Sequence, residues 1–251
     1  MEESICLEGF AAVKGALTGG FREMAQILID PKRDDRGITW LRREAERRGV
    51  RVKNETREEL DRLAESHGHG GVLAFVGQRR SLSAEELLPD ADSPFIVMLD
   101  GIEDPYNLGF AIRALWAAGV DGLVLRHRDW LSATTVIARS SAGASELMPT
   151  AEVSSPDEGA EIFRTLGLKI AVTTKEKNSR SLYETDLTVP LFLLIGGERR
   201  GVKRSFLDRA DLLLEIPYGR DFRQSLGAAS AASILGFEVL RQREVRREKS
   251  V

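Results

Sequence analysis

Five short apolar runs from Phe95 onward constrain the fold of the chain more than any other feature. Each holds four to six residues rich in Val, Ile and Leu, and the runs lie at 95–99, 122–125, 168–173, 191–195 and 212–216. Continuous apolar runs of this length are typical of parallel strands that are covered on both faces. Segments with helical periodicity separate several of them, at 108–118, 131–142, 157–166 and 224–247. The alternation predicts an α/β domain built on a mostly parallel sheet.

The first 80 residues predict a smaller α/β unit. Apolar residues have helical spacing at 9–17, a charged amphipathic stretch covers 38–48, and a buried-strand run covers 72–76. Ser83 and Glu86 then have the spacing of a capping box, and a link rich in Pro and Asp follows. We therefore expect three parts, with bounds of 1–80 for a first domain, 81–94 for a linker and 95–251 for a second domain.

Composition excludes several classes of protein. The chain has 36 basic and 39 acidic side chains and a formal net charge of −3, so any nucleic-acid site must be local. Cys6 is the single cysteine, and no zinc-ligand spacing surrounds it, so we expect no metal. The acidic start lacks the pattern of a signal peptide, and no apolar stretch reaches the roughly 18–20 residues that span a bilayer. We expect a cytoplasmic protein without a membrane segment.

The densest basic cluster lies in the first domain. Its cations, interleaved with Glu44 and Glu46, are Arg42, Arg43, Arg47, Arg48, Arg51 and Lys53. One interpretation is a solvated helix face with ion pairs four residues apart. The other is a patch that contacts phosphates. Composition alone does not choose between them.

Ligands of open parallel sheets bind beyond the carboxyl ends of the strands, and the first loop there carries polar residues. The loop at 100–109 runs into a helix that holds Arg113, and Asn107 is placed to cap that helix. An arginine within two turns of a helix start can meet an anion while its apolar neighbours pack inward. An ordinary capped helix with a surface arginine is the alternative.

Two further loops follow later strands. The loop at 196–201 contains Glu198 and two arginines, but it matches neither a dinucleotide fingerprint nor a Walker A pattern. The loop at 216–227 opens a helix rich in small residues. Its Ser225 reads as a serine at a helix start rather than as a nucleophile, because no histidine lies near it in the sequence.

These loops together resemble the motifs of the SpoU (TrmH-like) family of RNA ribose 2′-O-methyltransferases, part of the SPOUT class. The resemblance spans about residues 95–243, and its matching residues are Asp104-Pro105-x-Asn107-x-Gly109-x-x-x-Arg113, Ser141-Ala142-Gly143-Ala144, Gly196-Gly197-Glu198-x-x-Gly201, Ile216-Pro217, Ser225-Leu226 and Phe237-Glu238-x-x-Arg241-Gln242-Arg243. The first domain also resembles the family's N-terminal RNA-binding domain, a small ribosomal-protein-like α/β fold. There the matches are Glu8-Gly9-x-x-Ala12-Val13 and His69-x-Gly71-Val72.

The resemblance implies a methyltransferase domain with a deep trefoil knot, an exception to the general absence of knots. It implies S-adenosylmethionine as cofactor and a homodimer whose two chains complete the site. The implied cofactor contacts are Gly196, Ile216, Leu226 and, with less support from the motif, Thr173. The implied catalytic residues are Asn107, Arg113, Glu198 and Ser225. The implied RNA contacts in the first domain are Arg42, Arg43, Arg47 and Arg48.

The implied substrate is a ribose 2′-hydroxyl in structured RNA, with large-subunit ribosomal RNA as the first expectation and transfer RNA as the second. A ribose hydroxyl is a poor nucleophile, so the protein must align it with the methyl donor and stabilise developing negative charge. Arg113 suits the second task as a hydrogen-bond donor, because a guanidinium with a pKa above about 12 rarely gives up its proton.

Two positions depart from the family pattern. Gly227 stands where the family usually has asparagine, and Gly70 stands where glutamine is usual. Gly227 leaves a second function open, that of an RNA-binding or ribosome-assembly protein that retained the fold and lost methyl transfer. A nicotinamide-dependent oxidoreductase is disfavoured, because no glycine fingerprint follows the first strand of either half.

Overall fold

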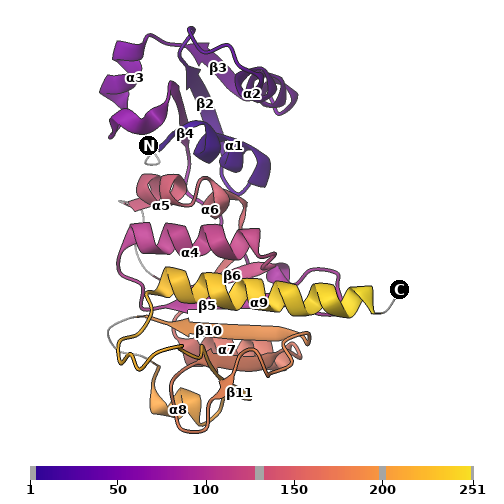
Figure 1. Ribbon diagram of the computed structural model, residues 1–251. Helices are drawn as coiled ribbons and strands as arrows, with labels where there is room; N and C mark the ends of the chain where they lie inside the picture. Colours follow the sequence, from indigo (N-terminus) through magenta and orange to yellow (C-terminus); the bar gives the residue numbers. More distant parts are fainter. Residues whose placement is uncertain (1–3, 128–132, 198–201, 250–251) are drawn as a thin grey trace. The chain divides into compact units, whose positions relative to one another are not determined.

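The computed structural model describes residues 4–127, 133–197 and 202–249 (Figure 1). The chain forms two compact units, each described here by itself. The first contains Met1–Arg80 together with Asp129–Leu147, and the second contains Ser81–Arg128 together with Met148–Val251. Residues 133–147 therefore belong with the N-terminal part of the chain, which bounds drawn along the sequence did not anticipate.

The first unit is a four-stranded sheet in the order β1-β4-β2-β3. β4 pairs antiparallel with β1 and β2, and β2 pairs parallel with β3. The strands are β1 (Ile5–Glu8), β2 (Met24–Ile29), β3 (Arg51–Asn54) and β4 (Val72–Val76). The helices are α1 (Phe10–Gly19), α2 (Arg36–Arg47), α3 (Arg57–Leu63), the 3-10 turn η1 (His67–His69), α5 (Thr134–Ser140) and α6 (Ala144–Leu147).

Alternation along β4 divides the core of this unit between the two faces of the sheet. Val72, Ala74 and Val76 belong to a cluster that includes residues of α1 and α2, whereas Leu73 packs with Leu60 of α3. Successive side chains of a strand point to opposite faces, so one apolar run serves both layers. The predicted run at 72–76 is β4, and the small α/β unit that the sequence predicted is present.

Residues 141–143 make a tight turn that brings α6 against α1. Gly143 has φ +82°, and a Cβ there would lie 2.2 Å from the carbonyl oxygen of Ala11. Ser141 is buried and its hydroxyl accepts from the amide of Ser145 at 3.1 Å. The helix predicted at 131–142 corresponds to α5, which ends at Ser140. The glycine turn that the approach of α1 requires separates it from α6.

A buried ion pair holds α6 to the end of α1. Arg22 Nε lies 2.7 Å from Glu146 Oε2, and both side chains are at most 5% exposed. Arg22 also donates to the carbonyl of Gly77 at 3.0 Å. A buried carboxylate that is paired in this way avoids the cost of an isolated buried charge.

The second unit is a seven-stranded sheet in the order β7-β6-β5-β10-β8-β11-β9, with every pairing parallel. Its strands are β5 (Phe95–Asp100), β6 (Gly122–Arg126), β7 (Thr150–Val153), β8 (Lys169–Thr173), β9 (Arg180–Ser181), β10 (Leu191–Gly196) and β11 (Leu212–Glu215). Its helices are the 3-10 turn η2 (Glu85–Leu87), α4 (Pro105–Ala117), α7 (Pro156–Thr165), α8 (Arg204–Leu207) and α9 (Ala228–Glu248). The predicted mostly parallel α/β fold is confirmed, and the five apolar runs are β5, β6, β8, β10 and β11.

The capping box that the sequence predicted before the second domain is present. Ser83 and Glu86 form both bonds of a capping box, since each side chain accepts from the other's amide, at 3.3 and 2.8 Å. Cys6 is half-buried, and burial raises the pKa of its thiol to about 12, so the thiol stays protonated at neutral pH. Within the described ranges, no helix combines the length and apolarity needed to cross a membrane.

Gly143→Ala and Gly49→Ala should separate close packing from backbone strain. Gly143 and Gly49 both lie in the first unit and have positive φ, but open space surrounds Gly49. We expect Gly49→Ala to cost about 1–2 kcal/mol of unfolding free energy from backbone strain. Gly143→Ala should cost a further ~1–3 kcal/mol, because the new methyl group must displace the backbone of α1. Urea unfolding followed by hydrogen exchange of the β4 amides measures both, and equal losses would contradict the close approach.

Candidate cofactor cavity and catalytic residues

A cavity of about 230 Å³ opens at the carboxyl ends of three neighbouring strands of the second unit. These strands, β10, β8 and β11, are adjacent in the sheet. The cavity is lined by Thr173, Thr174, Lys175, Ile195, Gly196, Gly197, Val202, Leu214, Ile216, Tyr218, Ser225, Leu226 and Ala231. The carboxyl edge of a parallel sheet is the usual place of a ligand site in such folds.

The structure brings the four residues named as cofactor contacts to this one cavity. Thr173 ends β8, Gly196 ends β10, Ile216 directly follows β11, and Leu226 lies two residues before α9. Residues from separate parts of the sequence meet here because parallel strands in register end at the same edge. Ser225, one of the residues named as catalytic, also lines the cavity and is exposed.

Tyr218 closes the loop between β11 and α9. Its phenolic oxygen accepts from the amide of Leu226 at 3.0 Å. The ammonium of Lys175 lies 3.5 Å from the centre of the Tyr218 ring and donates to the carbonyl of Phe222 at 3.4 Å. No sequence motif marks Tyr218 or Lys175, because their role depends on contacts across the loop.

Asn107 does not cap α4 as the sequence predicted. The N-cap is Asp104, whose carboxylate accepts from the amide of Tyr106 at 3.1 Å, and Pro105 occupies the first helical position. Proline is favoured at that position because its missing amide proton needs no partner there, so the helix begins earlier than the periodicity indicated. Asn107 is therefore in the first turn, where it is half-buried.

Arg113 lies two turns further along α4 and is exposed. It makes no ion pair with the described residues, and neither it nor Asn107 belongs to the described lining of the cavity. Glu198, the fourth residue named as catalytic, lies outside the described residues. The predicted cofactor contacts thus lie together at the cavity, whereas Arg113 lies on a separate helix, α4.

The start of α9 differs from the expectation for Ser225. The helix begins at Ala228 with Gly227 as its N-cap, and Gly227 supplies no side-chain hydrogen bond. Ser225 is therefore two residues before the cap and does not act as a helix-start serine. Its hydroxyl makes no hydrogen bond to the described residues, which leaves it available at the cavity.

The last of the family motifs, at 237–243, anchors α9. Arg243 donates to the carbonyls of Ser93 and Val189, at 2.6 and 3.1 Å. Gln242 accepts from the amide of Leu187 at 2.9 Å and donates to the carbonyl of Thr185 at 3.1 Å. Burial lowers the pKa of the Arg243 guanidinium. These residues fix the helix whose first turn borders the cavity.

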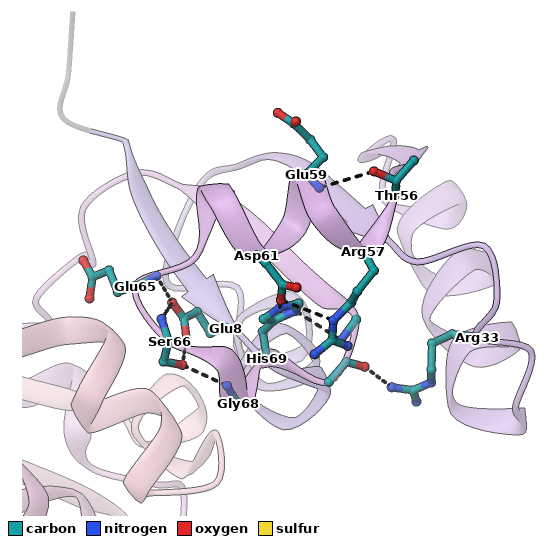
Figure 2. Close-up of polar contacts among 12 residues, drawn as sticks. Glu8, Arg33, Thr56, Arg57, Glu59, Asp61, Glu65, Ser66, Gly68 and His69 are labelled. Carbon is teal, nitrogen blue, oxygen red and sulfur yellow. Dashed lines mark hydrogen bonds and ion pairs between the residues drawn. The ribbon is translucent and has the colours of Figure 1, made fainter.

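The signature residues of the first unit are also structural. Figure 2 shows Glu8, which is buried, beside Glu65 and Ser66, with its carboxylate directed at them. Its carboxylate accepts from the amides of Glu65 and Ser66, at 2.5 and 3.2 Å, and from the Ser66 hydroxyl. His69 is fully buried, with Nε2 2.7 Å from Asp61 and Nδ1 accepting from the amide of Gly71 at 3.1 Å. The bond to His69 lowers the pKa of Asp61.

The four arginines named as RNA contacts do not form one surface. Arg47 and Arg48 both pair with Glu44, at 2.6 and 2.7 Å. These two hydrogen bonds, led by the one from Arg47, lower the pKa of Glu44 to about 2. Arg42 donates to Asn54 at 2.6 Å, whereas Arg43 is exposed and makes no ion pair with the described residues. No group of three His, Cys, Asp or Glu side chains that could hold a metal ion occurs in the described part of the chain.

Comparison with known proteins places this geometry in a family. The SpoU rRNA Methylase family model matches residues 94–237, more than half of the chain. The chain belongs to this family. A second model, for RNA 2′-O ribose methyltransferase substrate binding, matches residues 6–82. Both matches confirm the resemblance inferred from the loops of the two parts.

Relatives of this SpoU family chain extend over nearly its whole length. It is 31% identical over 246 residues to the 23S rRNA (guanosine-2′-O-)-methyltransferase RlmB of Shewanella oneidensis, covering 97% of this chain and 99% of that protein. To the protein of the same name from Pasteurella multocida it is 32% identical, covering 94% and 97%. The SpoU methyltransferase AviRb from Streptomyces viridochromogenes, solved with AdoMet, shares the fold with a TM-score of 0.77 at 24% identity, covering 96% and 91%.

Tyr218→Phe should loosen the cavity loop of this SpoU chain. The variant removes the acceptor of the Leu226 amide, a loss of ~1 kcal/mol that corresponds to about fivefold more frequent opening. Trypsin should then cleave after the exposed Arg220 and Arg223 about fivefold faster. Tyr183→Phe is the matched control, because Tyr183 is 53% exposed and its hydroxyl makes no hydrogen bond to the described residues. Equal cleavage of both variants would show that the Tyr218 bond does not hold the loop.

Proposed function

We propose that this SpoU family chain transfers a methyl group from S-adenosylmethionine to a ribose 2′-hydroxyl of large-subunit ribosomal RNA. The observation that carries the proposal is the convergence of Thr173, Gly196, Ile216 and Leu226 on one cavity at the carboxyl edge of the sheet. The names of the RlmB relatives support the RNA substrate, and their alignment covers both units. Transfer RNA stays the second candidate.

The lining of the cavity fits S-adenosylmethionine in kind. Val202, Ile216 and Leu226, all partly exposed, offer apolar surface for an adenine ring, and backbone groups past the strand ends offer donors and acceptors. Gly197 lies so close to Gly101 that a Cβ would be 2.2 Å from the Gly101 carbonyl oxygen, so the glycine pair lets two loops meet at the rim. When bound, the cofactor supplies a methyl group on a positively charged sulfur.

Arg113 has the chemistry to assist the attacking hydroxyl. Its guanidinium is a fixed donor that stabilises developing negative charge on the ribose oxygen and binds an adjacent phosphate. Asn107 stands about 1.7 turns earlier on the same helix, where its amide can orient the nucleotide. Ser225 is the one described residue named as catalytic that lines the cavity, where its hydroxyl is available to a bound substrate.

A second copy of the chain is proposed as the partner that completes the site. Tyr106, Phe110 and Arg113 follow each other at spacings of four and three, so they share one face of α4. Tyr106 and Phe110 are 56% and 49% exposed, so this face of α4 presents two large aromatic rings that a partner could cover. Pairing through this face would bring Arg113 of one copy toward the cavity of the other, whose own described lining lacks an arginine.

The order of the strands in the second unit supports a further proposal, a trefoil knot. β10 lies between β5 and β8, and the chain then returns past β8 to form β11, after which α9 packs against α4. This order of strands is compatible with the trefoil knot that the family resemblance implies. We place the protein in the cytoplasm, where ribosomal RNA is assembled into subunits.

A methyl-transfer assay tests the proposed function. Tritiated methyl groups from S-adenosylmethionine should enter purified large-subunit ribosomal RNA from a strain that lacks the gene. Arg113→Lys should lower kcat about 100-fold, because an ammonium cannot replace a bidentate donor at the developing charge. Arg164→Lys, on an exposed arginine that pairs with Asp211, is the control and should keep full turnover.

Two outcomes would contradict this proposal. Binding of S-adenosylhomocysteine without transfer to any RNA would favour the RNA-binding protein that Gly227 brought into consideration. Near-normal turnover of Arg113→Lys would exclude the bidentate role of the guanidinium.

Phe110→Glu should convert the proposed dimer to a monomer. A carboxylate in the centre of an apolar interface remains unpaired, which costs several kcal/mol of association free energy. Sedimentation velocity should show the parent as a dimer and this variant as a monomer. Tyr183→Glu, at a similarly exposed aromatic outside α4, should stay dimeric. A monomeric parent would exclude the partner arrangement.

A further inference from the structure

Helix α2 of the first unit presents a stripe of cations and one indole. The α2 stripe consists of Arg36, Trp40, Arg43 and Arg47, spaced by three or four residues so that they share one face of the helix. At 100° per residue, Glu44 and Glu46 lie about 80° to either side. The stripe itself therefore carries no acidic residue.

Lys14 of α1 extends the stripe. Its ammonium lies 5.1 Å from the centre of the Trp40 ring, a favourable position for a cation over an indole face. Lys14 is exposed and makes no ion pair with the described residues. Trp40 is half-buried, so one part of its ring system packs on the core while another part reaches the surface.

The two cations that the fold leaves least compensated are Arg36 and Arg43. Both are exposed, and neither makes an ion pair with the described residues. Arg36 occupies the first position of α2, where the helix dipole disfavours a positive charge. The neighbouring carboxylate of Asp35 is engaged with Arg33 and with the amides of Gly37 and Ile38. An external anion would supply the compensation that the protein does not.

The remaining cations of the cluster point elsewhere. Arg42 and Arg48 lie roughly 120° from Arg36 on opposite sides of the helix, and contacts with Asn54 and Glu44 hold them. Val52 packs on the α1 and α2 side of the sheet, so its strand neighbours Arg51 and Lys53 face the α3 side. Of the residues first named as RNA contacts, only Arg43 and Arg47 belong to the stripe.

We propose that the α2 stripe, together with Lys14, is the surface on which this protein docks RNA. Arg36 and Arg43 contact phosphates, and Trp40 offers a ring for stacking with an unpaired base. Phosphate contacts from exposed arginines and stacking on an aromatic ring are the two main sources of affinity for RNA loops. The inference rests on the proposed function, and it assigns the substrate contact to a defined face of α1 and α2.

Removing two charges from the stripe tests the proposal in the full chain. Arg36→Gln with Arg43→Gln should weaken filter binding of in vitro transcribed 23S ribosomal RNA at least tenfold at moderate salt. The slope of log K against log salt should shrink by about 1.5, since each phosphate contact contributes roughly 0.7–0.9. Arg57→Gln with Arg62→Gln removes the same charge from α3 and should leave both quantities nearly unchanged. Equal losses in the two double variants, or no loss in the first, would overturn the proposal.

Trp40 provides an independent test. Trp40→Leu should raise the KM for RNA about tenfold while kcat and S-adenosylhomocysteine binding stay constant, and Trp40→Phe should restore most of the affinity. Because Trp40 also packs on the core, circular dichroism must show that Trp40→Leu remains folded; the charge variants decide the matter if it does not. A KM unchanged in folded Trp40→Leu would remove the stacking contact from the proposal.

The parent enzyme separates failure of this inference from failure of the proposed function. If the parent methylates the RNA and the Arg36 and Arg43 variant keeps its KM, only the docking surface is wrong. If the parent transfers no methyl group to any RNA, the proposed function is wrong, whatever the binding data show.

Discussion

The parallel pairing of β10 with β5 on one side and β8 on the other is the constraint on which the second unit depends. Leu191 stands opposite both Phe95 and Lys169, so the three strands run in step and end at one level. Almost all of β5 and β10 is buried. Such strands have no surface on which to carry chemistry, and the polar residues that act on a ligand must lie in the loops beyond them. The cavity is where those loops meet.

In the second unit, the sequence predicted the buried strands well and the half-exposed ones poorly. Strands buried on both faces leave a continuous apolar run, and all five such runs in the second unit are strands. β7 alternates buried and exposed residues over only four positions, and β9 has two residues, so neither gives a clear signal. α3 was missed because it buries Leu60 alone among seven mostly charged residues.

Long-range contacts account for the other differences. The break at Gly143 within an otherwise helical segment is imposed by the backbone of α1, some 130 residues earlier in the chain. The residues proposed as cofactor contacts could be named in advance because the family motifs mark them, and three of the four stand at or directly after the end of a strand. The role of Tyr218 could not be predicted from the sequence, because it requires the amide of Leu226 to fold back toward the Tyr218 ring.

The basic cluster shows why density of charge along a sequence is a poor guide to a binding surface. Six cations within twelve residues are distributed by the period of a helix and the alternation of a strand over different directions. Glu44 then neutralises two of them, and the depressed pKa of its carboxyl records how strongly they are engaged. The direction of each cation and its ion pairs decide which cations are available to bind a polyanion. The net charge of the protein says little about this.

Burial separates the family signature into residues that hold the fold and residues that are free to act. Glu8, His69 and Ser141 are buried, and each has its polar atoms engaged by neighbouring amides or hydroxyls. Replacing any of them would leave a buried group without a partner, so their place in the signature follows from stability. Arg113 and Ser225 are exposed, and neither is needed by any described element for its own hydrogen bonding. A polar side chain that the fold neither buries nor uses is a sound candidate for contact with substrate, and this is consistent with the roles proposed for Arg113 and Ser225.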